Sequence, residues 1–302
     1  MERWLNSREV SEAAISAIVV NYNAGDLLPS CVASLFAGGA AEVLVVDNAS
    51  ADDSLAAAQA VALEKYPDRP FEVIQTGANL GFGRAVNIGA EAARGRLLAV
   101  CNPDCSVAPD SLGKLAAFLA ANPVAGVVAP MILDAHGIRY PSIRRFPSLW
   151  ISALHAALGL VWPTNPASRY YRSASDGPLG HDRWASGAFL MLPRQLFLEI
   201  GGFDDRYFMF LEDVELCRRL IAQGYQIGYE PQAVVVHHQG RSSISRPYFV
   251  LAQHSLSLWR YADQTLAGPG RLALPLVAVG ALLRFAVGSL KVAAKGLRGP
   301  SQ

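Results

Sequence analysis

Ile15-Ser-Ala-Ile-Val-Val-Asn-Tyr22 is a short apolar run rich in β-branched residues, and polar turn residues follow it directly. Three later runs have the same character: Glu42-Val-Leu-Val-Val-Asp47, Phe71-Glu-Val-Ile-Gln75 and Arg96-Leu-Leu-Ala-Val-Cys101. Stretches of helical composition, about 10 to 15 residues long, separate these runs. Strands that alternate with such helices predict an α/β fold with a parallel, doubly wound sheet and helices on both faces.

Polar side chains follow the predicted strands at their C-terminal ends. They are Asn21, Asp47, Asn79 and Asp104. Because parallel strands end at one edge of a sheet, these residues are expected to converge on that edge, where doubly wound sheets bind ligands.

The second half of the chain has a different composition. Residues 133–183 are rich in Pro, Arg, Tyr and Trp, which predicts loops and short helices over the sheet edge. The run 184–193 predicts a further strand that enters the site, and shorter β-rich runs follow at 225–229 and 233–237.

An acidic pair, Glu212-Asp213, stands between an aromatic loop and a predicted helix. The stretch from Gly201 carries the aromatic residues, and Val214 and Cys217 begin an apolar helix face. A helix N-terminus favours an ionised carboxylate, which can then accept a proton from a bound hydroxyl group. The alternative is that either acid only caps the helix.

Composition limits the possible classes of protein. The 302 residues are 52% hydrophobic and 17% charged, which indicates a part that faces lipid, and length favours about two domains. A net charge of +1 gives no general attraction for nucleic acid. The N-terminal residues include acids and no apolar run, so no signal peptide is predicted. Four cysteines in apolar segments predict reduced core residues: Cys31, Cys101, Cys105 and Cys217.

The C-terminal tail is predicted to be a basic amphipathic helix. The apolar run Leu272–Leu283 has 12 residues, too few for a bilayer crossing of about 20. Its basic residues have helical spacing that places them on one face, and such a helix commonly lies in a membrane interface. The alternative is a helix packed on its own domain or on a second copy in a homodimer. The basic residues are Arg284, Lys291, Lys295 and Arg298.

Seven motifs in this order resemble the family 2 glycosyltransferases of the GT-A fold, and within them bacterial rhamnosyltransferases that act on lipid-linked saccharides. The resemblance covers residues 14–260. The motifs are Val-Val-Asn-Tyr-Asn23, Val-Val-Asp-Asn-Ala-Ser50, Asn79-Leu-Gly-Phe-Gly83 with Asn87, Asn-Pro-Asp104, Gly-Ala-Phe189, Phe-Leu-Glu-Asp213, and His237 before Gly-Arg-Ser-Ser243.

The resemblance implies a Rossmann-like nucleotide-sugar site. Asn21 and Asp47 would hold the pyrimidine base, although strand-end turn chemistry explains either one alone. The glycines after Asn79 would let backbone approach the diphosphate, and the absence of a third glycine argues against a dinucleotide-binding dehydrogenase. The full implied nucleotide set is Asn21, Asn23, Asp47, Ser50, Asn79, Gly81, Gly83, Asn87, Asn102 and Arg241.

The resemblance also implies a Mn²⁺ or Mg²⁺ site at Asp104 and His237. Asn102 stands where the family pattern has its first acid, and would contact sugar or ribose instead. An imidazole ligand favours Mn²⁺. The alternatives are a buried strand-end histidine, or a ligand role for His238 in place of His237.

The implied reaction is a single displacement with inversion. Asp213 would be the general base and Glu212 would orient the sugar. Trp184, Gly187 and Ala188 would shape the acceptor site.

The implied organisation is a GT-A domain at 14–260, with a nucleotide-binding half at 14–105 and an acceptor half at 106–245. Residues 261–302 would associate with the membrane. The expected activity moves L-rhamnose from dTDP-rhamnose to a polyprenyl-diphosphate-linked sugar in cell-wall or surface-polysaccharide assembly, at the cytoplasmic face of the inner membrane. Alternatives are a UDP-hexose donor or a catalytically silent nucleotide-sugar-binding scaffold.

Overall fold

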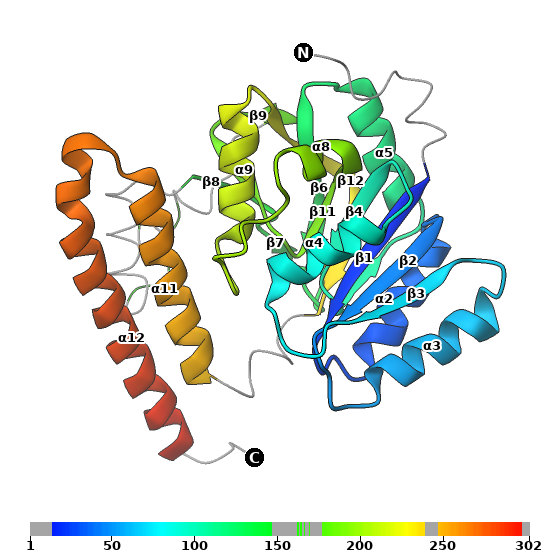
Figure 1. The fold of residues 1–302 in the computed structure, drawn as a ribbon, viewed down its shortest axis with the longest axis horizontal. Coiled ribbons are helices and arrows are strands. Elements are labelled where there is room, and N and C mark those ends of the chain that lie inside the picture. Colours follow the sequence, from blue (N-terminus) through cyan, green and yellow to red (C-terminus); the bar gives the residue numbers. More distant parts are fainter. Residues whose placement is uncertain are drawn as a thin grey trace.

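The computed structural model describes residues 14–146, 177–238 and 247–297, with positions 162, 164, 166 and 169 between the first two ranges. Side chains are described as far as residue 294. A central sheet carries helices on both faces, and a pair of helices lies beside it (Figure 1).

The sheet has the strand order β3-β2-β1-β4-β11-β6-β12-β5. β1, β2, β3 and β4 pair in parallel, as the sequence predicts. β11 then pairs antiparallel with both β4 and β6, so the complete sheet is mixed. The strands are β1 (Ile15–Asn21), β2 (Glu42–Asp47), β3 (Phe71–Gln75), β4 (Leu97–Cys101), β5 (Cys105–Val107), β6 (Ala125–Leu133), β7 (Arg139–Tyr140), β8 (Ile143–Arg145), β9 (Leu179–Gly180), β10 (Arg183–Ala185), β11 (Phe189–Pro193) and β12 (Gln226–His237).

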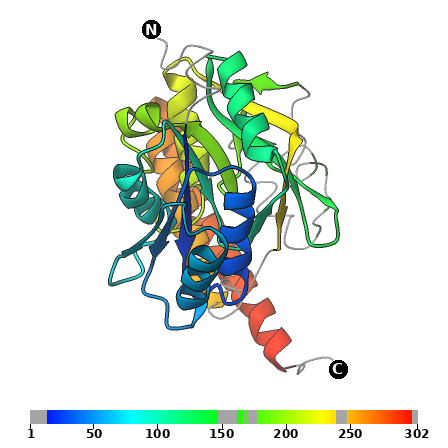
Figure 2. The same cartoon turned by 90° about the vertical axis from the view of Figure 1, so that its right-hand side faces the viewer.

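Helices cover both faces of the sheet (Figure 2). One apolar core forms between the sheet and α2, α3 and α5, and a second forms under α4, α8 and α9. The two cores confirm the predicted doubly wound arrangement. The helices are α2 (Leu27–Ala37), α3 (Ser54–Lys65), α4 (Phe82–Ala92), α5 (Ser111–Ala121), α8 (Arg194–Glu199), α9 (Glu212–Ala222), α11 (Pro247–Thr265) and α12 (Leu274–Leu297), with a 3₁₀ turn η1 (Gly268–Ala273) before the last.

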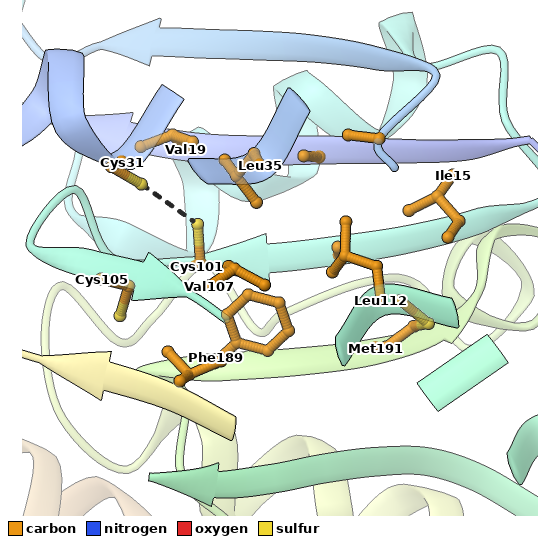
Figure 3. Close-up of a cluster of buried hydrophobic side chains, with 14 of the residues drawn as sticks. Ile15, Val19, Cys31, Leu35, Cys101, Cys105, Val107, Leu112, Phe189 and Met191 are labelled. Atoms are coloured by element: carbon orange, nitrogen blue, oxygen red, sulfur yellow. Dashed lines mark hydrogen bonds between the residues drawn. The ribbon is translucent and has the colours of Figure 1, made fainter. Parts of the chain in front are cut away.

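The first core includes a group of thiols (Figure 3). The sulfurs of Cys31 and Cys101 lie 3.8 Å apart, and Cys105 is buried in the same core. Cys217 is buried in the second core. All four cysteines are buried, which confirms their prediction as core residues.

The second half differs from the sequence prediction in two places. Where the structure describes 133–183, it has the short strands β7, β8 and β9, which were not predicted, and positions 166 and 169 are helical. The single strand predicted at 184–193 is divided into β10 and β11 by a turn at 186–188. That turn separates a strand of the main sheet from a strand that pairs only with β8.

The C-terminal helices form a hairpin beside the sheet domain (Figure 1). α12 has 24 residues and is therefore about 36 Å long. By length and composition the segment Gly268–Ala294 is long and apolar enough to cross a membrane. The prediction that the apolar tail is too short was therefore wrong, because the helix continues past the first basic residue. Its exposed apolar side chains are Leu276, Val279, Leu282, Leu283 and Leu290.

Candidate active site

The first polar cluster lies where β1 and β2 end side by side. Asn21 and Asp47 are register partners, and the amide nitrogen of Asn21 donates to Asp47 Oδ1 at 2.8 Å. The same nitrogen lies 3.0 Å from Ser50 Oγ and 2.9 Å from Ser54 Oγ. Ser50 Oγ in turn accepts from the backbone of Asn23. The structure therefore brings four predicted nucleotide residues together, and adds Ser54, which the sequence analysis did not single out.

A turn after β3 extends this cluster. The side chain of Asn48, another residue missed from sequence, donates to the carbonyl of Gly81 at 3.1 Å. The amide oxygen of Asn79 accepts from the N–H of Gly81 at 3.0 Å, which closes the turn before α4. Asn79 therefore shapes the turn between β3 and α4.

Gly81, Gly83 and Asn87 lie against the loop Gly201–Leu211. At Gly81, where φ is +87°, an added Cβ would lie 2.3 Å from the carbonyl oxygen of Phe208. At Gly83 it would lie 2.9 Å from the side chain of Phe203. The chain's own loop therefore lies closely against both glycines, through the Phe208 backbone at Gly81 and the Phe203 side chain at Gly83. The sequence reasoning, which assigned this space to a diphosphate, had no means of placing that loop.

Asn87 binds the same loop through both ends of its amide. Its oxygen accepts from the N–H of Phe203 at 2.8 Å, and its nitrogen donates to the Phe203 carbonyl at 2.8 Å and to Asp205 Oδ1 at 3.1 Å. Asn87 therefore holds the loop, and its contact with the nucleotide stays a prediction.

The second polar cluster joins the end of β4 to the end of β12. Asp104 Oδ1 lies 3.1 Å from His237 Nε2, and the amide nitrogen of Asn102 lies 3.4 Å from the same ring nitrogen. His238 faces elsewhere, with Nε2 3.3 Å from Ser106 Oγ. Of the two histidines, the structure brings His237 to the predicted metal ligand.

The donor set at this cluster fits a divalent cation. Among the described residues, buried Asp104 Oδ1 accepts no hydrogen bond, and His237 Nε2 is the ring nitrogen that faces it. One carboxylate and one imidazole suit Mn²⁺ that keeps water and ligand phosphate oxygens as its other ligands. Cys105 is close by, but its thiol donates to the carbonyl of Ala188 at 3.3 Å.

The acidic pair occupies the first turn of α9, as predicted. Asp213 Oδ2 accepts from the N–H of Gly187 at 2.8 Å, and Oδ1 accepts from the N–H of Val214 at 2.8 Å. Ala188, next to Gly187, accepts from the N–H of Asn102 at 3.0 Å. The turn between β10 and β11 therefore connects the acidic pair to the Asn102–His237 cluster.

Burial raises the pKa values of the acidic pair, whereas the N-terminus of α9 acts to lower them. Burial, and then the charge of Asp213, raise the pKa of Glu212 from its ordinary value of 4.5 to about 8. Burial also raises the pKa of Asp213, although the Gly187 and Val214 N–H groups and the charge of Arg144 act to lower it. The sequence argument considered only the helix N-terminus; in the structure desolvation is the larger effect. With a pKa of about 8, the carboxyl group of Glu212 keeps its proton at neutral pH.

The stability of the protein should depend on the proton of Glu212. A folded pKa of about 8, above the ordinary 4.5, means that this stability is present below pH 4.5 and lost as pH rises through 8. Glu212→Gln should therefore flatten the decline in unfolding free energy between pH 5 and 8, by on the order of a few kcal/mol. Calorimetric melting at several pH values measures this. Parallel native and variant curves would contradict the assignment.

Arg144 is a site residue that the sequence analysis missed. Its guanidinium carbon lies 5.0 Å from the ring centre of Tyr140 and 5.2 Å from that of Trp184. Trp184 is only 4% exposed, and its indole N–H donates to the carbonyl of Arg145 at 3.0 Å. Trp184 thus supports Arg144, whose charge acts on Asp213. The run 143–145 belongs to no motif, so only the pairing of β8 with β10 reveals it.

Arg241, predicted to bind the diphosphate, lies outside the described residues.

The mixed sheet, with polar residues at its strand ends and an acidic pair at the start of α9, agrees with the GT-A glycosyltransferase fold. The family model "Glycosyl transferase family 2" matches residues 16–214, and the chain belongs to that family. Its described fold agrees with a mannosyltransferase from Pyrobaculum calidifontis solved with GDP-Man and Mn²⁺. The TM-score is 0.58 at 18% identity, over 96% of this chain and 76% of that one.

Curated relatives are similar over most of the chain. An N-acetylglucosaminyl-diphospho-decaprenol L-rhamnosyltransferase of Mycobacterium tuberculosis is 35% identical over 285 residues, which is 89% of this chain and 90% of the relative. The rhamnosyltransferase WbbL of Escherichia coli is 30% identical over 131 residues, 42% of this chain and 46% of that protein. The predicted family and fold class are confirmed.

Proposed function

We propose that the protein transfers L-rhamnose from dTDP-rhamnose to a polyprenyl-diphosphate-linked N-acetylglucosamine in cell-wall assembly. The structural observation that carries the transfer reaction is the turn at 186–188, which joins the acidic pair of α9 to the Asp104–His237 pair. The mycobacterial relative's name, at 35% identity over 89% of the chain, supports the sugar and the acceptor.

The residues of this chain suit a single displacement. The acceptor hydroxyl loses its proton to Asp213 as its oxygen forms a bond to the anomeric carbon. The bond from that carbon to the diphosphate breaks on the opposite face, so the configuration inverts and the nucleoside diphosphate leaves with the electron pair. A protonated Glu212, whose Oε2 is buried without a hydrogen-bond partner among the described residues, can donate to a sugar oxygen.

Asp104 and His237 would hold the divalent cation, and Asn21 with Asp47 would hold the base. When bound, the cation neutralises charge on the departing diphosphate. Asn102, which approaches His237, would orient the ribose or sugar.

A thermal-shift screen with dTDP, UDP and GDP, with and without Mn²⁺, tests the donor. A ligand at 100 times its dissociation constant stabilises by about 2.7 kcal/mol. The rhamnosyl proposal requires a Mn²⁺-dependent shift that is largest with dTDP, followed by transfer to a lipid-linked acceptor. A larger UDP shift would select the hexosyl alternative. Binding without release of nucleoside diphosphate when acceptor is present would select the scaffold.

The hairpin α11–α12 is proposed to lie on the cytoplasmic face of the membrane. α12 carries Arg284 near its middle, which is costly in a bilayer core. Ser255 of α11 donates to the carbonyl of Ala281, so a crossing α12 would take the polar helix α11 with it. A surface position instead buries the exposed leucines and keeps the basic residues near anionic headgroups. The buried free thiols agree with a reducing compartment.

Charged substitutions on α12 should weaken membrane binding. Leu276→Glu, Leu283→Glu and Leu290→Glu each remove an exposed leucine, and each should lower partitioning to anionic vesicles by about tenfold. Co-sedimentation measures this. Leu63→Glu is the matched control, because that leucine is 73% exposed on α3. Unchanged sedimentation of all three variants would exclude this face as the membrane contact.

A further inference from the structure

The loop Gly201–Leu211 reaches the acidic pair through two residues in left-handed backbone conformation. Phe210 has φ of 70° and Leu211 has φ of 65°, and Glu212 follows directly. Bulky residues rarely adopt this region, so the conformation persists only where surrounding contacts determine it. The contacts that hold this loop therefore also set the position of the acids.

Two residues of the nucleotide-binding half bind the loop Gly201–Leu211. The N–H of Phe82 donates to the carbonyl of Phe208 at 3.1 Å, and Asn87 binds Phe203 through its backbone. Helices α8 and α9 hold the start of the loop, where the Gly202 N–H donates to the carbonyl of Phe197 and Arg219 donates to the carbonyl of Gly202. Helix α11 holds the part that leads into the acidic pair.

α11 binds each of four consecutive loop residues, 207 to 210. The hydroxyl of buried Tyr207 donates to Gln264 Oε1 at 2.9 Å. Ser257, itself fully buried, donates through Oγ to the carbonyl of Met209 at 2.8 Å. The rings of Phe208 and Phe249 lie edge to face with centroids 5.3 Å apart, and those of Phe210 and His254 are 5.1 Å apart.

The amide of Gln264 extends the contact to the start of the loop. Its nitrogen donates to Asp204 Oδ2 at 3.1 Å. The same carboxylate accepts hydrogen bonds from two side-chain nitrogens of Arg206. Burial would raise the pKa of Asp204, but these hydrogen bonds outweigh it and lower the pKa to about 2. The carboxylate is thus charged and fixed at neutral pH, and Gln264 links it to Tyr207.

We propose that α11 is part of the catalytic apparatus, with Ser257 and Gln264 as positioning residues that fix the Gly201–Leu211 loop and thereby the Glu212–Asp213 pair. The hairpin then has two roles: α12 contacts the membrane and α11 holds the base in place for an acceptor delivered there. The inference rests on the proposed transfer reaction.

Two serines two residues apart on α11 provide the test. Ser257→Ala removes a loop contact, whereas Ser255→Ala removes contacts only to the carbonyls of Leu251 and Ala281 within the hairpin. We expect Ser257→Ala to lower kcat by about 10- to 100-fold with detergent-dispersed acceptor, with unchanged donor KM and unchanged vesicle binding. Ser255→Ala should keep kcat within about twofold of native.

Tyr207→Phe is a second variant, which removes the hydrogen bond to Gln264 and keeps the ring. It should lower kcat in the same way. Hydrogen exchange supplies a readout without activity: amides 207–211 should exchange at least about tenfold faster in Ser257→Ala than in Ser255→Ala.

The outcomes separate the two proposals. A native protein that transfers no sugar refutes the proposed function, and the exchange comparison then decides the loop assignment alone. Equal kcat in the two serine variants, or equal exchange of 207–211, would overturn the positioning role.

Discussion

Replacing Asp213 by asparagine is expected to lower kcat by about 10²- to 10⁴-fold, the range that a general base contributes. The amide cannot accept the proton of the acceptor hydroxyl. Both Asp213 oxygens accept backbone N–H groups, from Gly187 and Val214, and asparagine can satisfy only one of them. The variant nevertheless loses the cost of a buried charge, so its melting temperature should change by only a few degrees. Steady-state release of nucleoside diphosphate measures kcat.

Donor binding is the internal control for this variant. The melting shift with dTDP and Mn²⁺ should equal that of the native protein, because the contacts of Asn21 and Asp47 do not involve α9. Turnover within about fivefold of native, with that shift intact, would remove Asp213 from its role as the base.

Replacing His237 by alanine is expected to lower Mn²⁺ affinity by about 100-fold or more and to abolish the metal-dependent part of nucleotide binding. Even residues that only support metal ligands are worth 10- to 100-fold in affinity. The reason is geometric, since Nε2 of His237 lies 3.1 Å from Asp104 Oδ1 and supplies the imidazole half of the set. A Mn²⁺ titration followed by thermal shift in the presence of dTDP measures the loss.

The neighbouring histidine is a matched control. His238→Ala removes an imidazole that faces Ser106 and should leave the Mn²⁺ titration unchanged. Asp104→Asn should reproduce the His237→Ala result. If His238→Ala lost the metal and His237→Ala kept it, the assignment of the ligand would have to be reversed.

Sequence reasoning predicted those features that depend on local pattern. The ends of β1 and β2 follow from apolar runs that stop at polar residues, and parallel pairing then brings Asn21 beside Asp47. The start of α9 at Glu212 follows from an acidic pair that precedes an apolar helix face. The resemblance placed Asp104 with His237 correctly, although more than a hundred residues separate them.

Features that depend on packing were not accessible. The segment that packs against Gly81 belongs to a loop about 125 residues later in the sequence. Glycine permits a close approach, but its presence does not tell which part of the chain makes that approach. Arg144 reaches the site because β8 pairs with β10, a pairing of three residues that no periodicity reveals. The raised pKa of Glu212 arises from burial, which a sequence shows only indirectly.

The continuity of α11 limits how chains of this family can be recombined. The sequence suggested a boundary at residue 260, and α11 continues through it to Thr265. A chimaera joined there would take Ser257 from one parent and Gln264 from the other, so the loop contacts would come from helices that were never selected together. A junction after Leu266 keeps α11 whole and takes all of its loop contacts from one parent.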